Sequence, residues 1–88
     1  MKKISTLAEL ENINLQPHSP YFGPGFLATL HILAASHGTQ PIERFYVTLD
    51  ADMYDTALQP TQGLIRVPDG PGLGLDPNPA FIKKYRID

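Results

Sequence analysis

Two ionisable side chains in this chain have the type and the position that proton-transfer chemistry requires. His18 follows the run 13–17, INLQP, and precedes a turn rich in proline and glycine. An imidazole titrates near neutral pH, so it can act as a general base or a general acid. In α/β folds, ligands collect at the carboxyl ends of strands and at helix N-termini. His18 is therefore the first catalytic candidate, and a histidine bonded to a neighbouring loop carbonyl is the alternative.

Glu43 is the second candidate, and the other two histidines are assigned to structure. The Glu43 carboxylate follows a proline turn, where it could serve a site or belong to a solvated strand face. His31 lies among apolar residues in the middle of a predicted helix, which favours a hydrogen-bonded core histidine. His37 precedes Gly38, and this pair is typical of a helix C-terminus.

The elements that must position these residues follow the order strand, loop, buried helix, extended segment. A capping box, Thr6 to Glu9, predicts a short first helix, and residues 13–17 predict a brief strand that a proline stops. Pro24 suits the first position of a helix that is apolar on nearly every face. Residues 41–49 have the β-branched and aromatic composition of an extended segment. This order predicts a βαβ unit, yet the chain holds too few strands to complete a parallel sheet.

The second half of the chain is expected to consist of turns and one short helix. Residues 60–63 predict a turn with an extended run beyond it, and Asn78 with Pro79 suits the start of a helix over PAFIKKY. The glycine run at 70–74 lacks the spacing of a nucleotide-binding loop, so it is interpreted as a rigid structural turn. Residues 50–55 lack the glycine of a calcium-binding loop.

Composition limits the class of protein and its partners. The 88 residues can form at most one small domain, and no cysteine is available for a disulfide or a thiolate metal site. The net charge is −2 with scattered basic residues, so no nucleic-acid partner is expected. The longest apolar stretch is interrupted and too short to span a bilayer, and no apolar signal segment follows the first lysines. We expect a soluble, cytoplasmic protein without a membrane partner.

Two stretches of the sequence resemble one enzyme family. They are PHSPYFGPGFLATLHILAA, followed by PIERF, and VPDGPGLGLDPNPAFIKKYRI, and together they cover nearly the whole chain. This pattern resembles the C-terminal portion of the mandelate racemase/muconate lactonizing enzymes, within the enolase superfamily. The Pro-Asp-Gly-Pro-Gly-Leu-Gly run with its following Asp-Pro and terminal Tyr-Arg is the more specific motif. The Pro-His-Ser turn before a helix of small residues is less specific.

The resemblance implies an α/β fold, namely the C-terminal fragment of a (β/α) TIM-type barrel. Residues 1–49 would supply the last β/α units of the barrel, with its last strands and the helix between them. Residues 50–88 would form an extended C-terminal tail that packs on an α+β capping domain. The glycine run would be a structural passage in that tail. Neither part would be a complete domain on its own.

The resemblance also implies roles for the two candidate residues. His18 matches a histidine that pairs with an aspartate and acts as general base or acid at the carbon next to a substrate carboxylate. Glu43 matches a glutamate that hydrogen-bonds that carboxylate, which requires a very short strand ending near Glu43. In the family, the Mg²⁺ ligands, a lysine base and the aspartate partner come from earlier barrel strands, which this chain lacks. The isolated chain is therefore expected to be inactive.

Three hypotheses follow for the function. The first is the C-terminal part of a Mg²⁺-dependent racemase or acid-sugar or hydroxy-acid dehydratase, a lyase or isomerase acting on a small carboxylate substrate. Its partners would be the remainder of the barrel and the capping domain. The second is a non-catalytic, free-standing remnant that self-associates through an uncovered sheet edge and apolar helix faces. The third is a small module that holds an anion at the helix start near Gly23, for which no specific motif exists. Dehydration is favoured over cycloisomerisation because of the histidine-containing turn.

Overall fold

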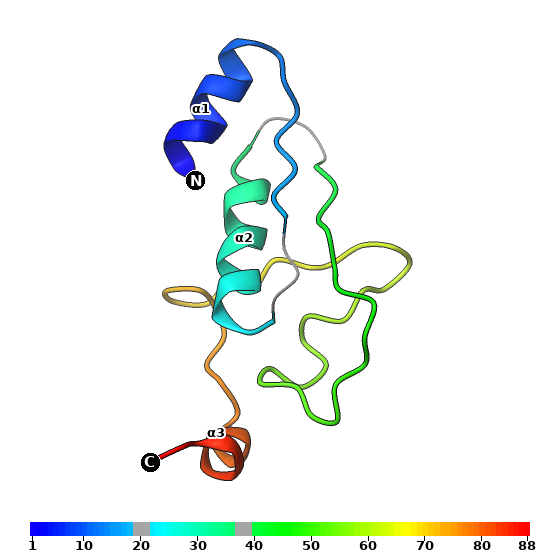
Figure 1. Cartoon of the computed structure of the whole chain (residues 1–88), viewed down its shortest axis with the longest axis vertical. Helices are drawn as coiled ribbons and strands as arrows, with labels where there is room; N and C mark the ends of the chain where they lie inside the picture. The colour runs from blue at the N-terminus through cyan, green and yellow to red at the C-terminus, as the bar shows by residue number, and fades with distance from the viewer. Residues whose placement is uncertain (19–21, 37–39) are drawn as a thin grey trace. The chain divides into compact units, whose positions relative to one another are not determined.

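The computed structural model describes residues 1–18, 22–36 and 40–88 of the chain (Figure 1). Within these ranges it contains three helices, α1 (Lys2–Leu10), α2 (Pro24–Ala34) and α3 (Pro79–Tyr85). The chain forms two compact units, Met1–Tyr46 and Val47–Asp88. The first unit holds α1, α2 and both candidate residues, and the second holds the turns and α3. The candidate chemistry therefore lies within a single unit.

The path of the chain in the first unit is that of a βαβ crossover. Residues 13–18 and residues 40–46 are extended segments that run in the same direction, and α2 runs in the opposite direction between them along the chain (Figure 1). A side-chain contact between His18 and Glu43 joins the two extended segments directly. The predicted order of elements is therefore present, but the extended segments do not form strands.

No β-strand is assigned in the described ranges, so the strand predicted at 13–17 and the short strand predicted to end near Glu43 are wrong for this chain. A strand exists only where a neighbour accepts and donates its backbone hydrogen bonds on at least one edge. The composition of these segments favours extended backbone, and the chain supplies too few neighbours to form a ladder. The α/β pattern thus appears as a path of the chain without a sheet.

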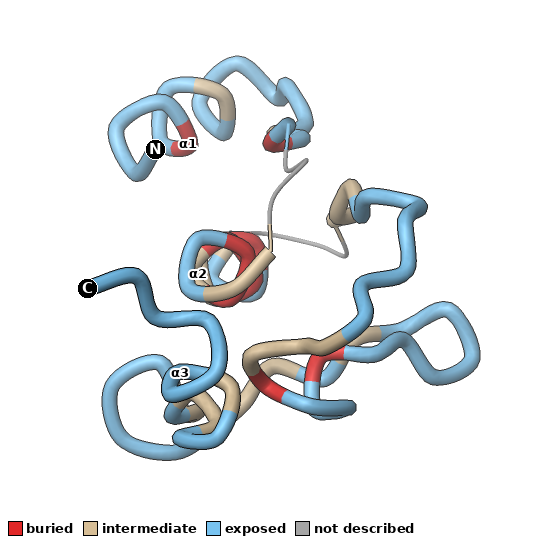
Figure 2. The backbone as a smooth tube through the Cα atoms, turned by 60° about the horizontal axis from the view of Figure 1, so that its bottom comes forward, coloured by how far each residue is buried: buried red, intermediate tan, exposed pale blue. Residues whose placement is uncertain are grey.

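Helix α2 supplies most of the buried apolar side chains of the first unit. Phe26, Leu27, Leu30 and Leu33 are at most 5% exposed, and Figure 2 shows the buried side of this helix. Thr29 is equally buried, and its hydroxyl donates to the Gly25 carbonyl at 3.0 Å, so its polar atom is satisfied. The predicted helix start is confirmed, because Pro24 occupies its first turn after an N-cap glycine with a φ of 73°. The helix ends at Ala34 with Ala35 as its C-cap, earlier than the predicted end at His37 and Gly38, which lie outside the described residues.

The start of α1 differs from the predicted capping box. The helix begins at Lys2, and the Thr6 hydroxyl donates back to the Lys2 carbonyl at 3.2 Å, so Thr6 lies inside the helix and caps nothing. The reason is local: four residues before Thr6 are free to continue the helix, and Thr hydroxyls in helices readily bond the carbonyl four residues earlier. Glu9 therefore lies in the last turn of α1.

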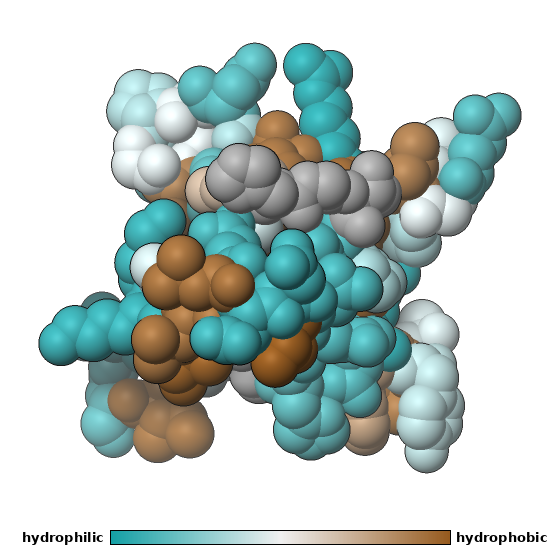
Figure 3. Space-filling view, turned by 90° about the horizontal axis from the view of Figure 1, so that it is seen from above, coloured by the Kyte–Doolittle hydropathy of each residue, from teal (hydrophilic) through white to brown (hydrophobic). Residues whose placement is uncertain are grey.

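Helix α1 leaves its apolar face exposed. Ile4, Leu7 and Leu10 are 63%, 65% and 73% exposed, and we call this set the α1 apolar face. The buried side chain of α1 is Ser5, whose hydroxyl lies 3.4 Å from that of Ser36. Figure 3 shows apolar atoms open to solvent among hydrophilic ones. A helix of this length is normally stabilised by burying its apolar side chains against other parts of a protein. Because these three side chains are exposed, a further protein surface could cover them.

Asn78 joins the loop at 53–55 to α3 in the second unit. Its side-chain oxygen accepts from the backbone N–H groups of Ala80 and Phe81, at 2.8 and 3.4 Å. Its side-chain nitrogen donates to both carboxylate oxygens of Asp55, at 3.0 and 3.1 Å, and its backbone N–H donates to the Met53 carbonyl at 2.8 Å. The predicted N-cap is confirmed, and the same amide also fixes the loop that precedes it by more than twenty residues.

The two predicted turns of the second unit are present. Thr61 and Leu64 exchange two backbone hydrogen bonds, of 2.8 and 3.0 Å, around a two-residue turn. The central residues, Gln62 and Gly63, both have positive φ, as a type I′ turn requires. In the glycine run, the Gly74 N–H donates to the Pro71 carbonyl at 3.0 Å. The run is therefore an ordered turn, as the sequence predicted.

A substitution at Gly74 is expected to disrupt this turn. Gly74 has a φ of 79°, and an added Cβ would lie 2.6 Å from the Cβ of Pro68 and 2.8 Å from its carbonyl carbon. Gly74→Ala is expected to cost about 1–2 kcal/mol for the left-handed backbone and about 1–3 kcal/mol more for the overlap. Faster hydrogen exchange of the residue 74 amide measures this loss.

Gly72→Ala is the matched control for that substitution. Gly72 has a similar φ of 65°, and nothing lies within 4 Å of an added Cβ. It should therefore show the backbone cost alone. Equal exchange rates at residue 74 in the two variants would contradict the close contact with Pro68.

Candidate functional site

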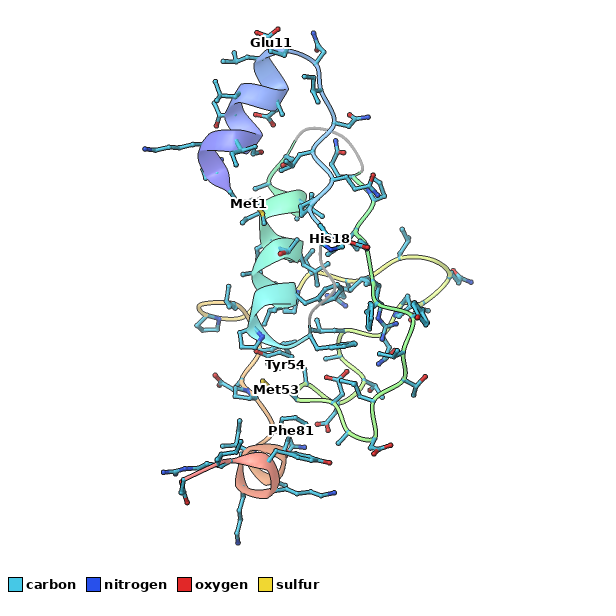
Figure 4. The ribbon with its side chains drawn as sticks, viewed as in Figure 1. Met1, Glu11, His18, Met53, Tyr54 and Phe81 are labelled. Atoms are coloured by element: carbon cyan, nitrogen blue, oxygen red, sulfur yellow. The ribbon has the colours of Figure 1, made fainter. Side chains whose placement is uncertain are left out.

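The side chains of His18 and Glu43 are in direct contact in the first unit. The Nδ1 atom of His18 lies 2.8 Å from Oε2 of Glu43, although the two residues are separated by α2 in the sequence. Figure 4 shows His18 on the segment that follows α1, turned toward the neighbouring extended segment. The structure thus brings together the two residues that the sequence analysis singled out.

The two extended segments position this pair. Pro17 is buried immediately before His18, and it fixes the backbone where the first segment ends. On the other side, the rings of Phe22 and Phe45 meet edge to face with their centroids 6.2 Å apart. Such an aromatic contact links the residues before α2 to the segment that carries Glu43. The buried proline before His18 and the ring contact near Glu43 therefore hold the two segments that carry the pair.

The pair is open to solvent. The side chain of His18 is 80% exposed and that of Glu43 is 40% exposed. An ion pair at such an exposed site contributes about 0–1 kcal/mol, because water screens it and both side chains lose conformational freedom. Catalysis by a base normally takes place where water is excluded. The described residues thus leave the imidazole and the carboxylate open to solvent.

His31 lies in α2 as predicted, but it is half-buried and not part of the core, and His37 lies outside the described residues. His31 is half-buried in α2 and takes part in an interaction with its surroundings. It lies in the last turn of the helix. His18 is in direct contact with the candidate carboxylate of Glu43.

The described residues provide no ligand set for a metal ion. No group of three or more His, Cys, Asp or Glu side chains in these ranges lies close enough together to hold one. A divalent ion of the Mg²⁺ type takes several oxygen ligands, usually from carboxylates and water. The part of the chain that the structure describes does not supply such a set of ligands.

The second unit contains an acidic concavity that the sequence analysis did not single out. An open cavity of about 460 Å³ is lined by Tyr54, Asp55, Asp76, Asn78 and their neighbours. Burial raises the pKa of the Tyr54 phenol above its ordinary value of 10.0, and the carboxylates of Asp76 and Asp52 raise it further. The phenol is therefore neutral at physiological pH. Asp55 is already bonded to Asn78, so this loop is a structural feature.

The first unit follows the path of a βαβ crossover without a sheet, and His18 and Glu43 meet where its first extended segment ends. A protein-family model described as "Enolase C-terminal domain-like" matches residues 1–81, and the chain belongs to this family. The resemblance that the two sequence motifs indicated is thereby confirmed. The family also supports the α/β class at the level of the whole domain.

One curated relative extends this assignment. The chain is 29% identical over 97 aligned residues to a D-galactarolactone cycloisomerase from Agrobacterium fabrum. The alignment covers 99% of this chain and 26% of that relative, so the chain spans about a quarter of the relative's length. No solved structure matches the chain. Separately, no helix in the described ranges is long and apolar enough to cross a membrane.

Proposed function

We propose that this chain is the C-terminal part of an enolase-superfamily enzyme that removes the proton next to a substrate carboxylate. The observation that carries the proposal is the contact between His18 and Glu43 in a chain of this family. An imidazole at the carboxyl end of an extended segment is suited to accept a proton near neutral pH. The substrate would be a small carboxylic acid or a lactone derived from one.

The two residues have separate roles in this proposal. His18 is the general base or acid at the carbon next to the carboxylate. Glu43 lies beside it, where its carboxyl group can serve the same site. The Mg²⁺ ion that the family resemblance implies would be held by residues outside this chain, since the described residues supply no ligand set. The chain would therefore complete an active site that the rest of a barrel begins.

The kind of reaction follows from the fate of the carbanion that proton removal creates. Return of a proton on the other face gives racemisation, and loss of a neighbouring hydroxyl gives dehydration. The histidine-containing turn favours dehydration. The relative is named for cycloisomerisation of D-galactarolactone, and isomerisation of such a lactone is therefore the second reaction to test.

A non-catalytic, self-associating remnant is the alternative function. The α1 apolar face favours it, because three large apolar side chains there are each more than 60% exposed. A second copy of the chain could cover this face, as could the remainder of a barrel. The catalytic proposal predicts activity when the remainder of a barrel is supplied, and the self-associating remnant predicts none.

A chimera tests the proposed function. We would replace the aligned 26% of the Agrobacterium fabrum relative with this chain, so that the relative supplies the remaining three quarters. The expected result is exchange of the substrate's α-hydrogen with solvent deuterium, measured by NMR on D-galactarolactone and on small hydroxy acids. Exchange reports proton removal even where the later steps fail.

The controls separate a failed fold from a failed function. The truncated relative without the added segment should show no exchange, and the chimera should show the circular dichroism of the intact relative. A folded chimera without exchange on any of these substrates would contradict the proposal. If the free chain then sediments as a defined oligomer, the self-associating remnant is supported instead.

A further inference from the structure

Helix α1 carries its apolar face on the side opposite its buried residue. Ser5 is 5% exposed, whereas Ile4, Leu7 and Leu10 of the α1 apolar face are 63%, 65% and 73% exposed. Each helical residue advances by about 100°, so Leu7 lies about 200° around the helix from Ser5. The buried side is the one whose Ser5 hydroxyl lies near that of Ser36. The side of α1 that contacts Ser36 is therefore not its apolar side.

Two charged residues stand at opposite ends of the same face. Lys3 precedes Ile4 and Glu11 follows Leu10, and both charged side chains are exposed. The Glu11 N–H donates to the Leu7 carbonyl at 3.3 Å, so Glu11 continues the helical path one turn beyond Leu7. Lys3 lies one turn before Leu7 in the same way, and residues spaced by four share a helix face. The α1 apolar face thus has a basic end and an acidic end, which Figure 4 marks by the labels of Met1 and Glu11.

This order of charges is unfavourable for a helix by itself. The N-terminus of a helix is partly positive and its C-terminus partly negative, so acidic residues stabilise the first turn and basic residues the last. Within Lys2–Leu10, α1 has no acidic residue in its first turn and no basic residue in its last turn. A surface with the opposite order of charges would offset this arrangement. A second α1 that runs antiparallel to the first has that order.

The face is symmetric about Leu7 in sequence. Ile4 and Leu10 lie three residues before and after it, and Lys3 and Glu11 lie four residues before and after it. In an antiparallel pair with a two-fold axis at Leu7, the two Leu7 side chains meet each other. Ile4 then meets Leu10 of the second copy, and Lys3 meets Glu11 of the second copy, at both ends. A two-fold contact of this kind is closed, so a dimer leaves no such face for a third copy.

We propose that the free chain forms a two-fold symmetric dimer in which the α1 apolar faces of two copies pack antiparallel. Apolar burial supplies the attraction. The charges select this orientation, because a parallel pair would place Lys3 against Lys3 and Glu11 against Glu11. Three apolar side chains per copy make a small interface, so we expect a dissociation constant on the order of 0.1 mM. The inference concerns the 88-residue chain and does not rest on the proposed function.

Sedimentation of the 88-residue chain, at concentrations on either side of this value, tests the dimer. We expect a monomer–dimer equilibrium that shifts toward monomer as salt rises, because salt screens exposed charges. Leu7→Lys places two like charges at the two-fold axis and is expected to weaken association about 100-fold or more. Leu7 is 65% exposed, so the circular dichroism of the variant should be unchanged. Thr6→Lys, an exposed position beside the face, is the matched control and should still dimerise.

Charge variants test the antiparallel register and control for folding. Glu11→Lys makes both ends of the face basic, and Lys3→Glu makes both ends acidic. Each variant alone is expected to dimerise about 10-fold or more weakly than the unmodified chain at low salt. An equimolar mixture of the two should regain association as a heterodimer, which requires that both variants are folded. Variants that fail to associate on mixing would contradict the charge pairs.

Single cysteines read the register directly, because the chain has no cysteine of its own. Leu7→Cys is expected to form a disulfide-linked dimer on oxidation, since the two side chains meet at the axis. Ile4→Cys is expected to cross-link with Leu10→Cys and not with itself, which a parallel pair would reverse. Thr6→Cys measures cross-linking by random collision.

Three results would overturn the inference. They are a monomer at every concentration, a dimer that Leu7→Lys leaves unchanged, and cross-linking of Thr6→Cys equal to that of Leu7→Cys. If the free chain is monomeric and Leu7→Cys in the chimera resists thiol reagents, the remainder of a barrel covers the face in place of a second copy. None of these measurements uses substrate or α-hydrogen exchange. Failure of the dimer is therefore distinct from failure of the proposed function.

Discussion

The purified 88-residue chain is expected to show no racemase, dehydratase or cycloisomerase turnover at any Mg²⁺ concentration. The described residues contain no cluster of ligands for a divalent ion, and the side chain of the candidate base is 80% exposed. Removal of a proton next to a carboxylate creates charge that must be stabilised in a site from which water is excluded. Neither condition is met by this chain alone.

The measurement is α-hydrogen exchange of carboxylate and lactone substrates in deuterium oxide, across a series of Mg²⁺ concentrations. The chimera with the relative is the positive control, since it differs by supplying the remaining three quarters of the protein. Mg²⁺-dependent exchange by the isolated chain, at a rate that survives repurification, would show that the chain holds a complete site.

His18→Asn in the active chimera is expected to lower kcat by about 10²-fold or more, with KM changing less. Asparagine is similar in volume and retains hydrogen-bonding groups, but it has no nitrogen that can take a proton at neutral pH. Exchange of the α-hydrogen on the face that His18 serves should be lost together with turnover. Kinetics and deuterium exchange of the same preparation measure both effects.

His31→Asn is the matched control for that substitution. His31 is half-buried in α2, and no catalytic role is proposed for it. Its replacement should alter stability more than kcat. If His18→Asn retains near-normal kcat and exchange, His18 is a turn residue bonded to a carboxylate, and the family role assigned to it does not hold in this chain.

The helices show how far local sequence can be trusted in this protein. Asn78 and Pro79 start α3 as predicted, because capping depends on residues within one turn of the helix end. Pro24 starts α2 for the same reason. The Thr6 to Glu9 box failed, because nothing before Thr6 stops the helix and the hydroxyl bonds the Lys2 carbonyl instead. A capping pattern marks a helix start only where the preceding residues cannot be helical.

The contact at the candidate site could not be predicted from local sequence. The sequence placed His18 at the end of an extended run and Glu43 after a proline turn, each with a structural alternative. Nothing in the two positions, 25 residues apart, indicates that Nδ1 and Oε2 are within 2.8 Å. That contact arises because α2 returns the chain beside the first extended segment. The link between Asn78 and Asp55 has the same origin, since it joins residues from different turns of the second unit.

The sequence by itself determined the family, the order of the elements, two of the helix starts and the identity of the two ionisable candidates. These features depend on residue types at short spacings along the chain, and these spacings are the same in any fold. The tertiary structure alone decided that His18 and Glu43 meet, that α1 exposes its apolar face, and that the extended segments form no sheet. Strands pair, and distant side chains meet, only where folding brings two segments of the chain side by side. Hydrogen bonds and apolar burial between distant segments therefore depend on the folded structure.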